Sequence, residues 1–305
     1  MIGQMFGQAQ EMAVERQVVN VASVAHRSPF RYPGGKTWLV PHTRQWLKSL
    51  PSKPPMFCEP FCGGAIVSLS VLFEGLVDNV VLVELDDDVA SVWQTMLNGD
   101  AEKLTDRIAS FELSRESVRA VLEQTPSNLL DKAFRTILRN RVQRGGILAA
   151  GASLMKHGEN GRGLASRWYA KTLQKRIKDI ASKSDCISFV HGDGIEFMRQ
   201  NARRPDAAFC IDPPYTVAGR RLYTHSEVDH EELFCVASTL QGDFLMTYDD
   251  AEPIRHLAAR FNFDVHSVPM KNTHHRIMAE LLIGRDLGWA RTQTRQLRQD
   301  PLFEL

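Results

Sequence analysis

A repeating order of strand and helix signals constrains the fold of this chain most strongly. An apolar run at residues 56–60 (MFCEP) leads through a glycine turn into a helical stretch at 65–76. A second apolar run follows at 79–86 (NVVLVELD) and ends in acids. This order is typical of the nucleotide-binding half of a doubly wound α/β sheet. Further strand signals lie at residues 186–193, 207–214, 243–250, 263–270 and 279–286. We therefore expect one α/β sheet, preceded by a helix over residues 37–50 that is interrupted at Pro41.

The strand signals lapse between about residues 95 and 185, where helical and basic character dominates. Residues 131–178 hold 12 of the 37 basic residues and 2 of the 36 acidic ones, a net charge of +10 in a chain whose total is +1. Such a block favours a polyanion as partner, although a solvated helical face is the alternative. The expected organisation is an arm (1–27), an α/β domain in two parts (28–95 and 185–290), a helical insertion (96–184) and a tail (291–305).

Composition narrows the class of protein further. No apolar run approaches the roughly 20 residues of a membrane span, and the N-terminus lacks the pattern of a secretory signal. The cysteines are odd in number and scattered, which is typical of reduced thiols in a cytoplasmic protein: Cys58, Cys62, Cys186, Cys210 and Cys235. Cys58 and Cys62 have no second ligand pair nearby, so we expect no metal site. Because no apolar run is long enough for a membrane span, we also expect no membrane partner.

The segment at residues 29–37, PFRYPGGKT, ends like a phosphate-binding loop. A true loop reads G-x-x-x-x-G-K-[ST], and Phe30 occupies the position of its first glycine. Pro29 and Pro33 remove two further backbone amides. The segment is therefore unsuited to a nucleoside triphosphate, and Lys36 must have another role.

In open α/β sheets ligands lie beyond the carboxyl ends of the strands, and two strands here end in suggestive groups. Gly63 and Gly64 follow the first strand and allow a close backbone approach to a ligand, with a plain tight turn as the alternative. Glu84 closes the second strand and can accept hydrogen bonds from two ribose hydroxyls. The alternative there is that the acids cap the next helix, for which Asp86 and Asp87 are suited.

The motif at residues 211–215, Ile-Asp-Pro-Pro-Tyr, carries the sharpest chemical signal. Adjacent prolines donate no amide hydrogens, so the turn presents only acceptors: the Asp212 carboxylate and the Pro213 carbonyl. Tyr215 adds a flat aromatic face. An acceptor pair beside an aromatic plate suits a planar substrate with an amino group, and a structural Pro-Pro turn is the alternative.

Taken in order, these segments resemble the D12 class of DNA adenine-N6 methyltransferases, of the Dam and DpnM type. The resemblance runs from about Pro29 to Gly284 and includes PFRYPGGK, EPFCGGA, VLVELD, IDPPY and the later segments YTHSEVDHEELFCVASTLQGDFLMTYDD and KNTHHRIMAELLIG. Ala65 stands where the family usually has a third glycine. The leader before Pro29 is longer than the family needs, and the insertion matches only loosely.

The resemblance implies a Rossmann-like S-adenosylmethionine-dependent methyltransferase sheet with an inserted, mostly helical DNA-recognition domain. The methyl group of S-adenosyl-L-methionine would pass to the N6 amino group of an adenine flipped out of a specific sequence in double-stranded DNA. The implied catalytic residues are Asp212, Pro213, Pro214 and Tyr215. The implied cofactor-binding residues are Tyr32, Lys36, Glu59, Phe61, Gly63, Gly64, Glu84 and Asp193. The expected DNA-binding residues are Arg135, Arg139, Arg141, Arg144 and Lys271.

Several alternatives stay open at this point. Asp193 has a helix N-cap as its alternative role. The acceptor could instead be RNA adenine or a protein glutamine, or the chain could be a catalytically silent DNA-binding protein. The sequence indicates neither the recognition site nor the oligomeric state, and it leaves open a cognate restriction enzyme as a partner.

Overall fold

The structure is a computed structural model, and it describes residues 23–31, 35–148, 152–158, 161–214, 228–271 and 277–291. Tyr32 and Tyr215, named above for the cofactor and the substrate, lie outside the described residues, as do most of the N-terminal arm and nearly all of the C-terminal tail. Of Lys271 the structure describes the backbone but not the side chain.

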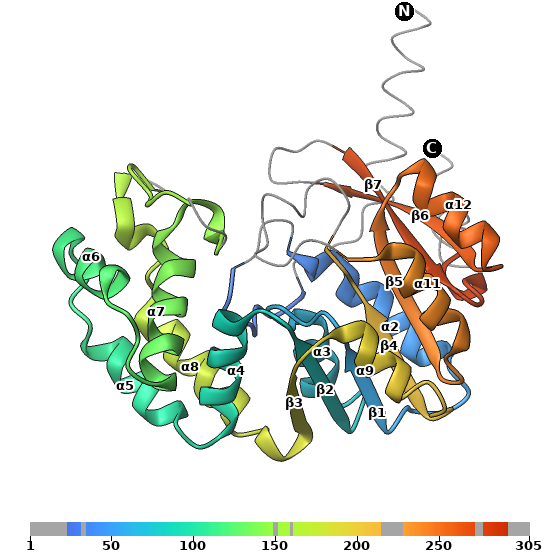
Figure 1. The fold of residues 1–305 in the computed structure, drawn as a ribbon, viewed down its shortest axis with the longest axis horizontal. Helices are drawn as coiled ribbons and strands as arrows, with labels where there is room; N and C mark the ends of the chain where they lie inside the picture. The colour runs from blue at the N-terminus through green and yellow to red at the C-terminus, as the bar shows by residue number, and fades with distance from the viewer. Residues whose placement is uncertain are drawn as a thin grey trace, which may run out of the picture.

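A seven-stranded sheet forms the centre of the fold, in the order β3-β2-β1-β4-β5-β7-β6. Its strands are β1 (Met56–Glu59), β2 (Asn79–Glu84), β3 (Ile187–His191), β4 (Ala207–Ile211), β5 (Asp243–Asp249), β6 (Asp264–Lys271) and β7 (Ile277–Gly284). The first five strands in this order pair in parallel, while β7 runs antiparallel to both β5 and β6 (Figure 1). Each expected strand is present, and the doubly wound α/β class is confirmed.

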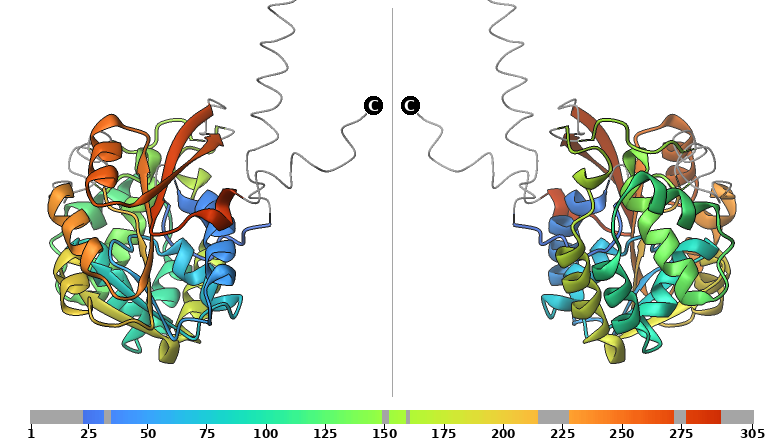
Figure 2. Two further views of the ribbon diagram at one scale, coloured as in Figure 1. Left: turned by 90° about the vertical axis from the view of Figure 1, so that its right-hand side faces the viewer. Right: turned by 90° about the vertical axis from the view of Figure 1, so that its left-hand side faces the viewer.

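Helices cover both faces of the sheet. One face carries α2 (Leu39–Ser49) and α3 (Ile66–Phe73), and the other carries α9 (Gly194–Gln200), α11 (His230–Thr239) and α12 (Glu252–Arg260) (Figures 1 and 2). Side chains alternate between the two faces along a strand. Because helices cover both faces, the central strands are apolar on both sides. In β4, Cys210 packs with the first set of helices and Phe209 with the second.

Helix α2 differs from its sequence-based expectation. The chain enters it through a 3-10 turn, η1 (Lys36–Trp38), and the helix continues unbroken from Leu39 to Ser49. The expected interruption at Pro41 was wrong. Pro41 is the third residue of the helix, and an N–H in the first turn has no intrahelical acceptor to lose.

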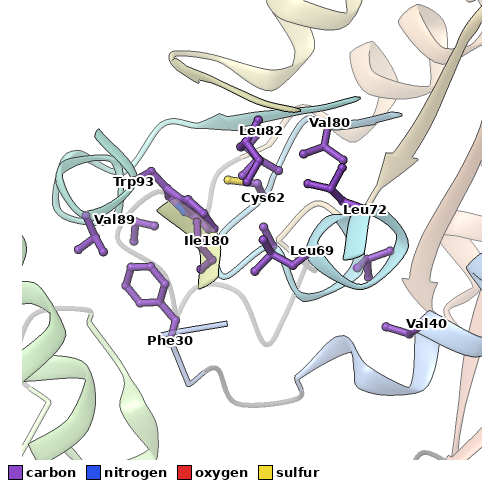
Figure 3. Close-up of a cluster of buried hydrophobic side chains, with 14 of the residues drawn as sticks. Phe30, Val40, Cys62, Leu69, Leu72, Val80, Leu82, Val89, Trp93 and Ile180 are labelled. Atoms are coloured by element: carbon purple, nitrogen blue, oxygen red, sulfur yellow. The ribbon is translucent and has the colours of Figure 1, made fainter. Parts of the chain in front are cut away.

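Between β2 and β3 the chain forms a group of helices that stands beside the sheet (Figure 1). They are α4 (Asp87–Leu97), α5 (Ala101–Ser110), α6 (Arg115–Glu123), α7 (Leu129–Val142) and α8 (Ala170–Ala181), with short 3-10 turns at η2 (Arg144–Gly146), η4 (Gly163–Ser166) and η5 (Ser184–Cys186). One buried cluster runs from the sheet into these helices. Figure 3 shows Ile180 of α8 and Phe30 of the opening segment in the same cluster as Val89 and Trp93 of α4.

Candidate active site

The loop after β1 is tied to the neighbouring strand. The Gly63 N–H donates to Glu84 Oε2 at 2.9 Å, and the Trp93 indole N–H donates to the Gly63 carbonyl at 2.8 Å. Ala65, just before α3, has a φ of 48°, in the left-handed region that glycine usually occupies. A residue with a Cβ pays roughly 1–2 kcal/mol there. Ala65 therefore keeps the backbone shape that the usual glycine would adopt.

The acidic residues at and after the end of β2, Glu84 and Asp86, have different roles. Asp86 caps α4, since its Oδ1 accepts from the N–H groups of Asp88 (2.8 Å) and Val89 (3.0 Å). Glu84 instead faces the loop, and its second oxygen accepts from the Asp86 N–H at 2.8 Å. Part of Glu84 remains accessible, yet desolvation of its carboxyl group raises the pKa to about 7, against the lowering effect of these N–H groups.

Glu59, at the end of β1, is only 5% exposed. Its Oε2 accepts from the Ser68 N–H at 3.1 Å and from the Ser68 hydroxyl at 2.5 Å. Burial raises its pKa to about 8, Ser68 opposes the rise, and the charge of Asp212 adds to it. Glu59 is therefore mostly protonated at neutral pH and braces the first turn of α3.

Asp212, directly after β4, is anchored through one of its oxygens. The Thr247 hydroxyl of β5 donates to Asp212 Oδ1 at 2.8 Å, and Lys36 Nζ lies 3.0 Å from the same atom. Lys36 Nζ also lies 3.6 Å from Glu280 Oε2 of β7. Thr247 and Lys36 both approach Oδ1, so Oδ2 is the oxygen that can accept from another group. Lys36, predicted to serve a cofactor, thus has partners within the protein.

The sequence did not single out Thr247 or Glu280. Their only signal is position, because Thr247 is close to the end of an apolar strand and Glu280 is an acid within one. Both side chains come from the part of the sheet where β7 is inserted antiparallel, next to β5.

The remaining predicted residues surround this centre. Pro213 is buried and Pro214 half-buried after Asp212. Asp193 caps α9, since its Oδ1 accepts from the Glu196 N–H at 2.9 Å. Phe61 packs partly buried against the second core cluster. The parallel pairing of β1, β2 and β4 brings the ends of these strands to one edge, so the glycine loop, Glu84 and Asp212 open on the same side.

Comparison with family models gives a match to the D12 class N6 adenine-specific DNA methyltransferases over residues 32–273. The chain belongs to this family. It is therefore an N6-adenine DNA methyltransferase, which confirms the expectation drawn from the resemblance.

The structural likenesses are distant. The rRNA methyltransferase aviRa from Streptomyces viridochromogenes is 11% identical, with a TM-score of 0.40 over 89% of this chain and 92% of that one. Spermidine synthase from Thermotoga maritima is 11% identical, with a TM-score of 0.33 over 94% of this chain and 66% of that one. A comparison with curated protein sequences found no match.

The basic residues predicted to bind DNA have different surroundings in this methyltransferase. Arg139 pairs with Asp88 of α4 at 2.7 Å, and Arg141 is 4% exposed and donates to the Pro29 carbonyl. Arg144 is exposed, and Arg135 is half-buried. Part of the positive charge of the basic block is thus paired with an acid or buried within the protein. Within the described residues, no helix is long and apolar enough to cross a membrane.

Proposed function

We propose that Asp212 and Pro213 of this methyltransferase hold the amino group of an adenine flipped out of duplex DNA, and that S-adenosyl-L-methionine supplies the methyl group. The anchoring of Asp212 Oδ1 by Thr247 and Lys36 carries the proposal. A carboxylate fixed through one oxygen presents the other in a set direction, as catalysis by positioning requires.

The amino nitrogen of adenine is a poor nucleophile because its lone pair is delocalised into the ring. Its two N–H groups need two acceptors, and Asp212 Oδ2 with the Pro213 carbonyl supplies them. Hydrogen bonds to both acceptors favour a tetrahedral nitrogen with a localised lone pair, directed at the sulfonium methyl group. Electrostatic complementarity of this kind acts mainly on the transition state. Extrusion of the base costs a few kcal/mol, which stacking on Tyr215 would help to offset.

The residues along the same edge suit the methyl donor. Each Glu84 oxygen accepts one backbone N–H and keeps a lone pair, which fits the two hydroxyls of a ribose. The Gly63–Gly64 backbone would approach the methionine part, and Tyr32 and Phe61 would line the pocket. Asp193 caps α9 through Oδ1, which leaves its other oxygen for the amino group of the cofactor adenine. Glu59 would act indirectly, through the position of α3.

Double-stranded DNA would lie across the helical insertion. Arg144 is exposed and suited to a phosphate contact, and Lys271, the last residue of the edge strand β6, is a second candidate. Arg139 is better assigned to α4, since Asp88 already balances its charge. Base readout within the insertion would give the enzyme its specific sequence.

Methyl transfer tests these roles directly. We would incubate the enzyme with radiolabelled S-adenosylmethionine and unmodified duplex DNA, then identify the labelled nucleoside. Asp212→Asn should abolish transfer and leave cofactor affinity, measured by calorimetry, within about twofold. Asp206→Asn is the matched control, since Asp206 precedes β4 and lies at the other end of the same strand. Label in N6-methyladenine supports the proposal, whereas label only in RNA or peptide, or full activity in Asp212→Asn, contradicts it.

A further inference from the structure

Two arginines of the helical insertion hold the start of the opening segment. Arg141 of α7 donates to the Pro29 carbonyl, and Arg176 of α8 donates to the Ser28 carbonyl at 3.0 Å. These carbonyls belong to neighbouring residues, so the two guanidinium groups lie close together although α7 and α8 are separate helices. Phe30, the next residue, is buried in the first core cluster (Figure 3).

Arg31 is fixed beside this pair through its backbone. The Asn140 side chain accepts from the Arg31 N–H at 2.8 Å and donates to the Arg31 carbonyl at 2.7 Å. Gly146 passes so close that a Cβ there would lie 2.6 Å from the Arg31 carbonyl oxygen. Arg167, at the end of η4, completes a group of four, because its charge acts on both Arg31 and Arg141. We call these residues the arginine cluster: Arg31, Arg141, Arg167 and Arg176.

Three members of the cluster, Arg31, Arg141 and Arg176, have no acidic partner in the part of the chain that the structure describes. No carboxylate there lies within 4.0 Å of Arg31, Arg141 or Arg176, in contrast to Arg139 with its partner Asp88. Arg141 is 4% exposed, and its Nε has no hydrogen-bond partner in the described part. Burial, with the charges of Arg176, Arg31 and Arg167, lowers its pKa to about 9. A buried cation among like charges is unfavourable unless an anion binds there.

A purely structural role does not account for all four residues. Arg141 and Arg176 donate hydrogen bonds to two backbone carbonyls. That role needs hydrogen-bond donors, but it does not need further positive charges beside them. The Arg31 side chain makes no hydrogen bond within the described residues, so its guanidinium has no bracing role. Beside the cluster, Tyr169 is 43% exposed, and the Arg162 guanidinium lies 5.9 Å from its ring centroid. Arginines beside an exposed aromatic ring are typical of nucleic-acid surfaces.

We propose that the arginine cluster binds a backbone phosphate of the DNA strand that carries the target adenine. The inference rests on the proposed function, which makes duplex DNA the substrate. Guanidinium groups match phosphate oxygens in pairs, and the charges of the buried Arg141 and the half-buried Arg176 add attraction for an anion beside them. Arg31 precedes Lys36 by five residues, so their Cα atoms are at most about 18 Å apart. Lys36 contacts Asp212, which places the bound phosphate within a few nucleotides of the reacting base.

The salt dependence of DNA binding tests the proposal. We would measure the affinity of the full-length enzyme for a mixed-sequence duplex of about 24 base pairs at several salt concentrations. Arg31→Gln and Arg167→Gln should each weaken binding roughly 10-fold. They should also reduce the slope of log K against log salt by up to about 0.9, the value for one phosphate contact. Arg204→Gln is the matched control because Arg204, an exposed arginine paired with Asp206, precedes β4 at the opposite edge of the sheet.

Thermal unfolding gives a second readout with a distinctive sign. Removal of the Arg31 charge relieves repulsion in the free protein, so Arg31→Gln should raise or preserve Tm without DNA. It should also reduce the rise in Tm that the duplex causes. A structural role predicts the reverse, a lower Tm without DNA and an unchanged rise. If Arg31→Gln keeps the salt slope of the wild type and has a lower Tm, the proposal about the arginine cluster is wrong. The proposed function is unaffected by that result as long as the wild type methylates DNA. A wild type that binds no DNA would refute both proposals.

Discussion

Because of Glu59, we expect the free energy of unfolding to decrease as pH rises. Burial raises the pKa of this carboxyl group from an ordinary value of 4.5 to about 8 in the folded chain. Between these values the folded state holds a proton that the unfolded state has lost. Its contribution is therefore complete below pH 4.5 and is lost as pH rises toward 8, by up to about 1.4 kcal/mol per pH unit.

The magnitude is large enough to measure. From pH 5 to pH 8 the loss in unfolding free energy due to Glu59 is on the order of 3 kcal/mol. Glu59→Gln replaces the protonated acid with a neutral amide of the same shape, whose oxygen can still accept from Ser68. We expect the variant to be the more stable form at pH 8 and to lose much less stability over this range. Glu84, whose pKa is also raised, continues to titrate in both proteins.

Urea unfolding at four pH values, followed by circular dichroism, provides the assay. The quantity of interest is the difference in unfolding free energy between variant and wild type, which should grow with pH. Glu123→Gln is the control, since Glu123 is exposed on α6. Parallel stability curves for Glu59→Gln and the wild type would refute the assignment of a buried, protonated carboxyl group.

Three further substitutions test the contacts around the site. Thr247→Val removes one donor to Asp212 and should lower kcat about 10-fold or more at unchanged cofactor affinity; steady-state kinetics with calorimetry checks this, and an unchanged kcat would contradict it. Asn140→Ala loses three hydrogen bonds at a buried position and should lower the unfolding free energy by about 3 kcal/mol in urea; a loss below about 1 kcal/mol would count against the clamp on Arg31. Asp86→Ala removes the cap of α4 and should cost about 1 kcal/mol in the same assay, with equal stability as the contrary result.

The elements of the sheet were predictable because buried strands are short apolar runs bounded by turns. The strands at β1, β2 and β4 gave such signals, and the groups after them meet at one edge as parallel strands require. Pro41 misled the prediction because a proline disrupts the interior of a helix, through a lost hydrogen bond and a clash with the preceding turn, but is tolerated in the first turn. That depends on where the helix begins, and the sequence did not define this.

The partners within the site were less predictable. Asp212, Glu84 and Gly63 follow strands, so their placement needed only the strand pattern. Thr247 and Glu280 reach Asp212 and Lys36 through the neighbourhood of β5 and β7, and periodicity does not encode the order of strands. In the basic block, net charge could not distinguish Arg139, which pairs with Asp88, from Arg144, which is exposed.

The continuous buried cluster that joins the sheet to the helices beside it limits how this enzyme can be re-engineered. Its members include Leu69 of α3, Trp93 of α4, Ile137 of α7 and Leu173 of α8. An exchange of the whole insertion with that of a relative would cut through this shared interior and expose apolar surface on both pieces. Under the proposed placement of the DNA, a change of target sequence is better sought at exposed side chains in the turn after α7, where Arg144 lies. The shared interior thus favours point substitution over exchange of the whole insertion as the way to alter this part of the protein.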